Sequence, residues 1–274
     1  MSAPTFASIV YPTDFSTGNI PAFMHALRIA VAAKSRLSLL HVVGYEVEDD
    51  EGIPFPHVRK TLVKWGMLEA EAPKAAVADR LGLHAVRAQV ENYNVSAGVE
   101  SYVHEQNCDL LVLMTHGRRG PSRWMYGSIA SETARRSKVP TLFLRKGVHG
   151  FVDRETGAVS LKRVVIPVDP AIAPLPARRL VEALALALQS PCEIRLLSVG
   201  DVAPSFGGDW PAVETRRGPV VETIVGYAKE IGADLIAMPT AGRRGLFDAL
   251  LGSTTERVIH EADQPVLAVP AQEA

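Results

Sequence analysis

The feature that most constrains the fold is an internal repeat that spans most of the chain. A stretch THGRRGPSRWMYGS begins at Thr115, and TAGRRGLFDALLGS begins at Thr240, with seven of fourteen positions shared. An apolar run precedes and follows each stretch: CDLLVLM and KVPTLFL in the first copy, ADLIAMP and DQPVLAV in the second. Each copy also opens on an apolar run that ends in Pro-x-Asp, at Asp14 and at Asp169. The 274 residues therefore predict two tandem domains of one fold, each large enough to bury a core.

Short apolar runs alternate with helical patterns along the first copy. The runs are rich in β-branched residues and nearly continuous, as in strands that are buried on both faces of a sheet. We expect helices at 21–34, 58–81 (interrupted near Pro73), 96–106 and 128–137, and strands from residue 8 and at 37–43, 85–90, 109–114 and 141–145. This alternation predicts an α/β fold with a Rossmann-like, doubly wound parallel sheet and right-handed crossovers.

The second copy repeats this order but lacks one helix. Its Pro-x-Asp motif lies 155 positions after the first one, whereas its glycine motif lies only 125 positions after the first one, so about 30 residues are missing. A helix at 176–189 and a strand at 193–199 are expected, and then 201–210, rich in Gly and Pro, is typical of a loop. That loop, or another subunit, must cover the sheet where the helix is missing.

A linker separates the two copies. We expect a first domain at 1–146, a hairpin linker at 147–161 and a shortened second domain at 162–274. Two short alternating runs flank the turn-forming residues at 155–157, which favours a hairpin over a plain coil.

The glycine motif follows the fourth strand, at the sheet edge where doubly wound folds bind ligands. Its first glycines let bare backbone N–H groups approach a ligand, and its Gly-Ser opens a helix whose first N–H groups favour an anion. The arginines add donors that suit phosphate oxygens. The motif consists of Gly117, Arg118, Arg119, Gly120, Gly127 and Ser128 in copy one, and of Gly242, Arg243, Gly245, Gly252 and Ser253 in copy two. Neither a Walker A string nor G-x-G-x-x-G occurs, and helix capping, with a Ser253–Glu256 capping box, explains only part of the motif.

Two motifs occur in each copy: Pro-x-Asp at the end of strand one, and, after strand four, a glycine followed nine residues later by Gly-Ser. Together they resemble the ATP-binding branch of the universal stress protein family, here in tandem. The resemblance implies an adenine nucleotide alpha hydrolase-like fold and ATP, with or without Mg²⁺, as the ligand. The resemblance implies that the carboxylate after strand one, which approaches the ribose or adenine, is Asp14 in copy one and Asp169 in copy two. It implies that Val42 and Val199 lie by the adenine. The phosphate contacts fall on Gly117, Gly127, Ser128 and Ile129, and on Gly242, Gly252, Ser253 and Thr254. We add Pro12, Thr13, Met114 and His116, which belong to the same motifs.

The family resemblance has two further consequences. It implies that strand five of each copy, 141–145 and 265–269, pairs with its counterpart as an internal pseudo-dimer, with a homodimer of whole chains left open. The family's motif has a glycine where this chain has Met114 and Pro239, and proline has no N–H. We therefore expect unequal nucleotide sites, with the better one in copy one.

Composition excludes several other function classes. A formal net charge of −1 provides no global field to recruit nucleic acid or an anionic membrane, and no run of residues is long and apolar enough to span a bilayer. The two cysteines predict neither a disulfide framework nor a zinc site, and the eight histidines are scattered, so we expect a cytoplasmic protein without a metal centre.

Three functions remain open from the sequence. The first is a stress-response protein that binds ATP or a related adenine nucleotide and acts as a switch or interaction module with unknown protein partners. The second is a slow ATPase, although no dedicated catalytic set of residues is present. The third is a structural pseudo-dimer whose pockets bind no nucleotide.

Overall fold

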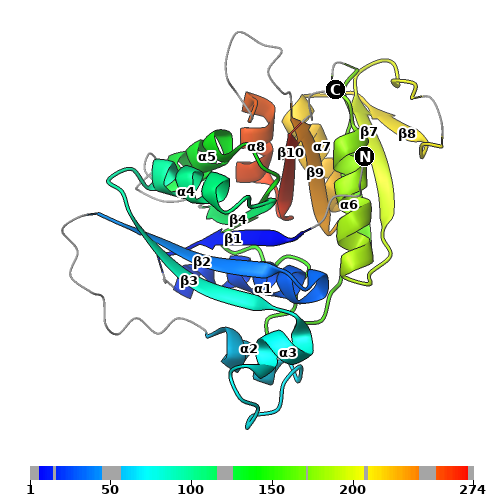
Figure 1. Ribbon diagram of the computed structural model, residues 1–274. Coiled ribbons are helices and arrows are strands. Elements are labelled where there is room, and N and C mark those ends of the chain that lie inside the picture. Colours follow the sequence, from blue (N-terminus) through cyan, green and yellow to red (C-terminus); the bar gives the residue numbers. More distant parts are fainter. Residues whose placement is uncertain are drawn as a thin grey trace.

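The computed structural model describes residues 6–14, 17–44, 57–115, 126–170, 172–206, 209–240 and 251–270. Its ten strands form one sheet with the order β3-β2-β1-β4-β5-β10-β9-β6-β7-β8, so the second half mirrors the first (Figure 1). The strands are β1 Ser8–Pro12, β2 Arg36–Val43, β3 His84–Glu91, β4 Leu110–Thr115, β5 Thr141–Arg145, β6 Arg163–Pro167, β7 Glu193–Val199, β8 Val213–Arg216, β9 Leu235–Thr240 and β10 Val266–Pro270. The expected α/β fold with two doubly wound halves is confirmed.

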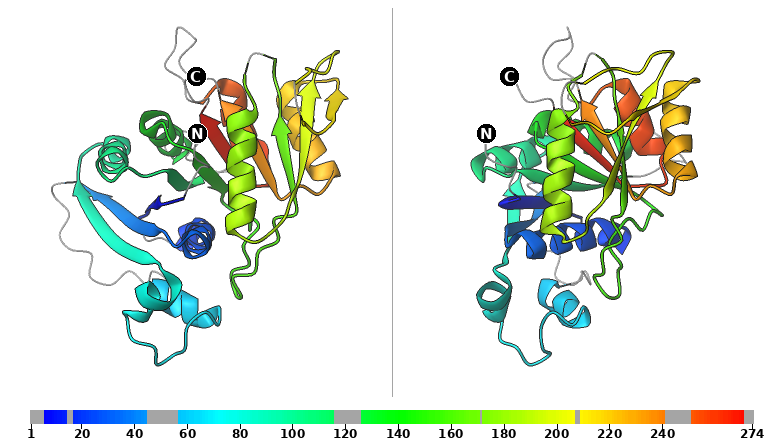
Figure 2. Two further views of the ribbon diagram at one scale, coloured as in Figure 1. Left: turned by 45° about the vertical axis from the view of Figure 1, so that its right-hand side comes forward. Right: turned by 90° about the vertical axis from the view of Figure 1, so that its right-hand side faces the viewer.

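Helices cover both faces of the sheet. They are α1 Ile20–Ala33, preceded by the short 3-10 helix η1 Thr17–Asn19, α2 Val58–Lys64, α3 Ala76–Leu81, α4 Val95–Glu105, α5 Tyr126–Ser137, α6 Leu175–Ala187, α7 Val220–Glu230 and α8 Ser253–Glu261. One face carries α1 and α6, and the other carries α4, α5, α7 and α8 (Figure 2). Central strands are therefore buried on both sides, which explains their continuous apolar runs: Ile9 and Val10 of β1 face opposite layers and are both fully buried.

The two copies share one core because their last strands pair. β5 and β10 run antiparallel, with Leu142 opposite Leu267 and Phe143 opposite Val266, whereas every other strand pair of the described sheet is parallel. Helices α1 and α6 also contact each other across this junction. The expected pairing of the two fifth strands is thus present within the chain, and it removes both apolar edges.

The linker between the copies forms a hairpin. Val152 lies opposite Val159, and the Asp153 N–H donates to the Ala158 carbonyl at 2.9 Å. Gly157, at its turn, has a φ of +69°, and a Cβ there would lie 2.5 Å from the Trp65 ring. This hairpin therefore packs against copy one, and its turn requires glycine.

The expected long helix at 58–81 is two short helices, α2 and α3. Gly66 takes a left-handed conformation with φ +69°, and α2 ends just before it at Lys64, more than two turns before Pro73. Pro73 then lies between the two helices, where its missing N–H and its restricted preceding residue disfavour continuation. The expectation of one helix, interrupted only near Pro73, was wrong because the break begins at Gly66.

A loop covers the second copy where the helix is missing, as expected. Phe206 and Trp210, from the segment between β7 and β8, pack against the core with ring centroids 5.1 Å apart. The Arg178 guanidinium of α6 lies 4.8 Å from the Trp210 ring centroid and fixes this cover from the helix side. Within the described part of the chain, no helix is long and apolar enough to cross a membrane.

Candidate functional site

The candidate site lies where the strand order reverses. β1 pairs with β2 on one side and with β4 on the other, all parallel, so their carboxyl ends meet at one edge of the sheet. In copy two, β6 pairs in the same way with β7 and β9. The chain winds outward in opposite directions from these strands, which leaves a crevice beside the strand ends in doubly wound folds.

In copy one, the Pro-x-Asp motif turns away from the end of β1. The Thr13 N–H donates to the Leu40 carbonyl at 2.8 Å, which extends the pairing with β2 by one residue. Pro12 is partly buried and Thr13 is buried, whereas Asp14 is exposed beyond the strand. The Asn19 amide donates to Asp14 Oδ1 at 2.5 Å and orients that carboxylate. Asp14 is thus held at the strand end and open to solvent.

A close helix approach positions the end of β2. Val42 is partly buried, and a Cβ on Gly98 of α4 would lie 2.9 Å from Val42 Cγ1, so only glycine lets the helix come this near. Next to it, His41 Nδ1 lies 2.7 Å from the Thr13 carbonyl oxygen. His41 therefore ties β2 to the Pro-x-Asp turn, in a partly buried position.

The third part of the site is the end of β4 and the start of α5. Met114 is partly buried, and the Thr115 hydroxyl is buried with no hydrogen-bond partner among the described residues. Gly127 and Ser128 lie in the first turn of α5, followed by Ile129, which is 40% exposed. His116, Gly117, Arg118, Arg119 and Gly120 lie outside the described residues.

Copy two places the equivalent residues in the same way. The Val168 N–H donates to the Leu197 carbonyl at 2.8 Å, Asp169 is exposed beyond β6, and Val199 ends β7 in a partly buried position. Pro239, the counterpart of Met114, is buried opposite Val269. Gly242, Arg243 and Gly245 lie outside the described residues.

Helix α8 begins differently from the capping box expected for Ser253 and Glu256. Gly252 is the N-cap, with φ −67° and ψ 159°, and no side chain accepts a hydrogen bond there. Ser253 is the first helical residue, exposed, and Thr254 follows it partly buried. The expectation of a capping box was wrong because the chain turns at Gly252, one residue before the serine. The N-cap of α8 therefore gives its first N–H groups no side-chain acceptor.

Asn19 belongs to this site but was not among the residues expected from the sequence. It is the N-cap of α1, and its backbone carbonyl accepts a hydrogen bond from the Tyr11 hydroxyl at 3.0 Å. Burial raises the pKa of Tyr11 well above its ordinary value, so this phenol stays protonated and donates. An asparagine just before a helix, five positions after the motif aspartate, was the available signal.

Metal and thiol chemistry find little support in the described residues. No group of three or more His, Cys, Asp or Glu side chains is arranged there to hold a metal ion. Cys108 is buried and Cys192 half-buried, both as free thiols, and burial raises the pKa of each.

The comparisons with known proteins agree with the geometry. A family model described as the universal stress protein family matches residues 5–145 and 211–270. A universal stress protein of Methanocaldococcus jannaschii is 31% identical over 140 residues, 39% of this chain and 81% of that protein. One from Mycobacterium tuberculosis is 25% identical over 259 residues, 84% of this chain and 86% of that protein.

The solved structures agree in fold. A universal stress protein from Archaeoglobus fulgidus matches with a TM-score of 0.63 at 17% identity, over 99% of this chain and 98% of that one. The family model leaves out 146–210, yet β6, α6 and β7 in that segment occupy the places of β1, α1 and β2 in the mirrored sheet. The chain therefore belongs to the universal stress protein family, as a tandem of two copies.

Proposed function

We propose that this protein binds an adenine nucleotide, ATP in the first instance, and acts as a nucleotide-dependent switch or interaction module. One observation carries the proposal: Asp14, Val42 and Thr115 lie at the carboxyl ends of three adjacent strands where the strand order reverses. This is the position at which doubly wound sheets bind nucleotides.

The described residues fit such a ligand. Asp14 offers an exposed carboxylate that can accept hydrogen bonds from ribose hydroxyls. The buried Thr115 hydroxyl, which has no partner among the described residues, stands at the end of β4 directly before the glycine motif. At the start of α8, no described residue lies within 4 Å of a Cβ built on Gly252, and the first N–H groups of a helix favour an anion such as phosphate.

The chemistry of these residues favours binding over turnover. A hydrolase needs a general base or an activated nucleophile within hydrogen-bond reach of the reacting atoms. Asp14 is held instead by the Asn19 amide, which orients the carboxylate as an acceptor. We therefore assign the nucleotide a signalling role through conformation or partner contacts, with slow hydrolysis as the alternative.

Mass spectrometry of small molecules released from freshly purified full-length protein tests the proposal. We expect ATP in the released fraction and calorimetric binding of added ATP, weakened about tenfold by Asp14→Asn because a charged acceptor is lost. Asp79→Asn, on the exposed side of α3, is the matched control and should leave affinity unchanged. If the purified protein releases no nucleotide and gives no heat with ATP, the structural pseudo-dimer without nucleotide binding is the remaining function. Release of ADP with phosphate would favour the slow ATPase.

A further inference from the structure

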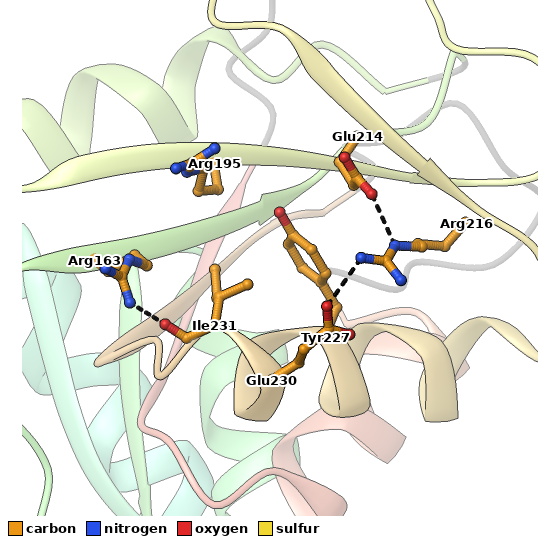
Figure 3. Close-up of a pocket in the computed structure, with 7 residues that line it drawn as sticks. All are labelled: Arg163, Arg195, Glu214, Arg216, Tyr227, Glu230 and Ile231. Atoms are coloured by element: carbon orange, nitrogen blue, oxygen red, sulfur yellow. Dashed lines mark hydrogen bonds and ion pairs between the residues drawn. The ribbon is translucent and has the colours of Figure 1, made fainter.

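A charged pocket lies in copy two between α7 and the strands β6, β7 and β8 (Figure 3). Its cavity volume is about 330 Å³, enough for a small metabolite. Three arginines, two glutamates and one tyrosine provide its polar lining: Arg163, Arg195, Arg216, Glu214, Glu230 and Tyr227. None of these residues belongs to the candidate nucleotide site.

Copy one has an apolar contact at the same place. Strand register makes Ser38 the counterpart of Arg195, Ala88 that of Glu214 and Val90 that of Arg216. Ser38 is buried, and Ala88 and Val90 pack against the core there. The pocket of copy two is therefore a local replacement of packed side chains by charged ones on an otherwise equivalent backbone.

The equivalent tyrosines show the difference most directly. Tyr102 of α4 donates its hydroxyl to Ser38 at 3.0 Å, and Tyr227 occupies the same position on α7. Tyr227 is only 6% exposed, yet its hydroxyl makes no hydrogen bond with any described residue. In Figure 3 the hydroxyl points toward the strands, between Arg195 and Glu214. A phenol oriented this way can donate to a ligand.

Charges of both signs are fixed around this hydroxyl. Arg216 is clamped by two carboxylates, with Nε 2.8 Å from Glu214 Oε1 and Nη2 3.0 Å from Glu230 Oε1, and its guanidinium lies 5.4 Å from the Tyr227 ring centroid. The clamp uses one oxygen of each glutamate. Each carboxylate keeps a second oxygen that can accept from a cation.

Arg195 provides the opposite charge on the other side of the hydroxyl. Its Nη2 lies 2.6 Å from Glu193 Oε1, and Glu193 Oε2 also accepts from Arg163 Nε at 3.3 Å. Since a guanidinium has five N–H donors, this single ion pair leaves Arg195 donors for a carboxylate in the pocket. Arg195 thus lies on one side of the Tyr227 hydroxyl and Glu214 on the other (Figure 3).

We propose that this pocket binds a small zwitterion with a carboxylate and an ammonium group, such as a free α-amino acid. The carboxylate would accept hydrogen bonds from Arg195 and the Tyr227 hydroxyl, and the ammonium group would donate to Glu214 and Glu230. Glu214 and Glu230 offer acceptors that a phosphate group has no cation to pair with, so the pocket favours a zwitterion over inorganic phosphate or a nucleotide. Copy two would then carry a metabolite site that copy one lacks.

Isothermal titration of the full-length chain with each standard amino acid, and with acetate, methylammonium and inorganic phosphate, tests this. We expect at least one amino acid to bind, and the three simple ions to bind at least about tenfold more weakly because each meets only one half of the site. Arg195→Ser and Glu214→Ala introduce the residues that copy one has at the equivalent positions. Each should weaken the binding of that amino acid about tenfold or more.

Tyr227→Phe keeps the ring and should weaken binding a few-fold, while the matched Tyr102→Phe in copy one should leave it unchanged. The two tyrosine variants keep the proposal testable if the charge variants fold poorly. Absence of heat with every amino acid would overturn the proposal. So would phosphate binding that matches or exceeds the best amino acid, or equal losses from Tyr102→Phe and Tyr227→Phe.

Discussion

The two copies have the same framework and different edges. In both, the aspartate before strand four accepts backbone hydrogen bonds from the start of strand one: Asp109 Oδ2 from the Ala7 N–H at 2.7 Å, and Asp234 Oδ2 from the Lys162 N–H at 2.7 Å. The central strands β1 and β6 each have three consecutive apolar residues that are fully buried. The copies diverge around the edge strands, where copy one has two helices and an apolar contact while copy two has a loop and a charged pocket.

The position of the differences has a physical cause. A central strand packs against helices on both faces and pairs on both sides, so a change there disturbs many neighbours at once. An edge strand such as β8 pairs on one side only, and Glu214 and Arg216 within it are partly exposed. Charged replacements are therefore tolerated at the edge. The comparison indicates that one copy of a duplicated fold can acquire charged side chains near its edge while the central strands keep the same arrangement.

The largest effect on stability is expected at the junction of the two copies, where β5 pairs with β10. Phe143 of β5 is 1% exposed and lies opposite Val266 of β10, and its counterpart in copy two is only Ala268. Phe143→Ala removes the one large ring at this position of the junction, so we expect the free energy of unfolding to fall by about 3 to 5 kcal/mol. Urea unfolding followed by circular dichroism would measure this.

The same variant tests whether the junction couples the copies. If they share one core, a single transition should shift to lower urea, with both copies unfolding together. Two transitions, one of them at the wild-type midpoint, would show instead that copy two is stable without the junction.

A second contrast concerns α1 and α6, where copy one has His25 and copy two has Leu180. His25 is fully buried, with Nδ1 2.7 Å from the Pro21 carbonyl oxygen and Nε2 accepting the Phe151 N–H at 3.0 Å. Because Nε2 accepts this hydrogen bond, the histidine that holds the linker is neutral. Burial lowers its pKa from 6.5 to about 4. Between these values the unfolded state binds more protons, so the free energy of unfolding falls as pH falls, by about 3 kcal/mol in total.

Urea unfolding at a series of pH values checks this, with His25→Leu as the matched variant. The variant leaves the Phe151 N–H without its acceptor and should be less stable at pH 7 by about 1 to 3 kcal/mol. Its stability should then fall less than that of the wild type on acidification. An identical pH dependence in the two proteins would exclude His25 as the cause.

Much of this arrangement could be predicted from the sequence, because it rests on patterns that repeat. Continuous apolar runs indicated the strands, and 141–145 and 193–199 match the observed β5 and β7. The Pro-x-Asp motifs lie at the ends of β1 and β6, as expected, whereas the nucleotide site that they indicate stays a prediction. The split of the long helix depends on Gly66, whose left-handed φ is a tertiary outcome that helical periodicity does not encode.

The pocket of copy two could not be predicted for a different reason. Arg195 lies on β7 whereas Glu214 and Arg216 lie on β8, and charged residues in short strands are more typical of a solvated face. Only the register of β7 against β8, together with the tyrosine of α7, brings them around one cavity. Aligning the two copies would have shown the change from serine, alanine and valine, but a repeat comparison alone does not reveal a cavity.

A smaller effect is expected from the arginines of the first glycine motif, which lie outside the described residues. If Arg118 and Arg119 contact phosphate oxygens, replacing both with Ala should weaken ATP binding on the order of tenfold at low ionic strength and less at high salt, because salt screens exposed charges. Calorimetry at two salt concentrations measures the difference. Arg80→Ala, an exposed arginine on α3, is the control. Equal losses at both concentrations would indicate a structural role instead.

The smallest expected effect separates the two nucleotide sites themselves. Met114 keeps a backbone N–H at the end of β4, whereas Pro239, at the same place in β9, has none, so site two lacks one donor. One hydrogen bond corresponds to about a threefold to tenfold difference in affinity. Gly127→Glu and Gly252→Glu each place bulk and negative charge at one site. Gly252 has a negative φ, and no described residue lies within 4 Å of a Cβ built there, so it accepts the change without backbone strain. Titrated with ATP, the Gly127 variant should retain only the weaker site and the Gly252 variant only the tighter one. Tight binding that survives in the Gly127 variant and disappears in the Gly252 variant would reverse the order of the two copies.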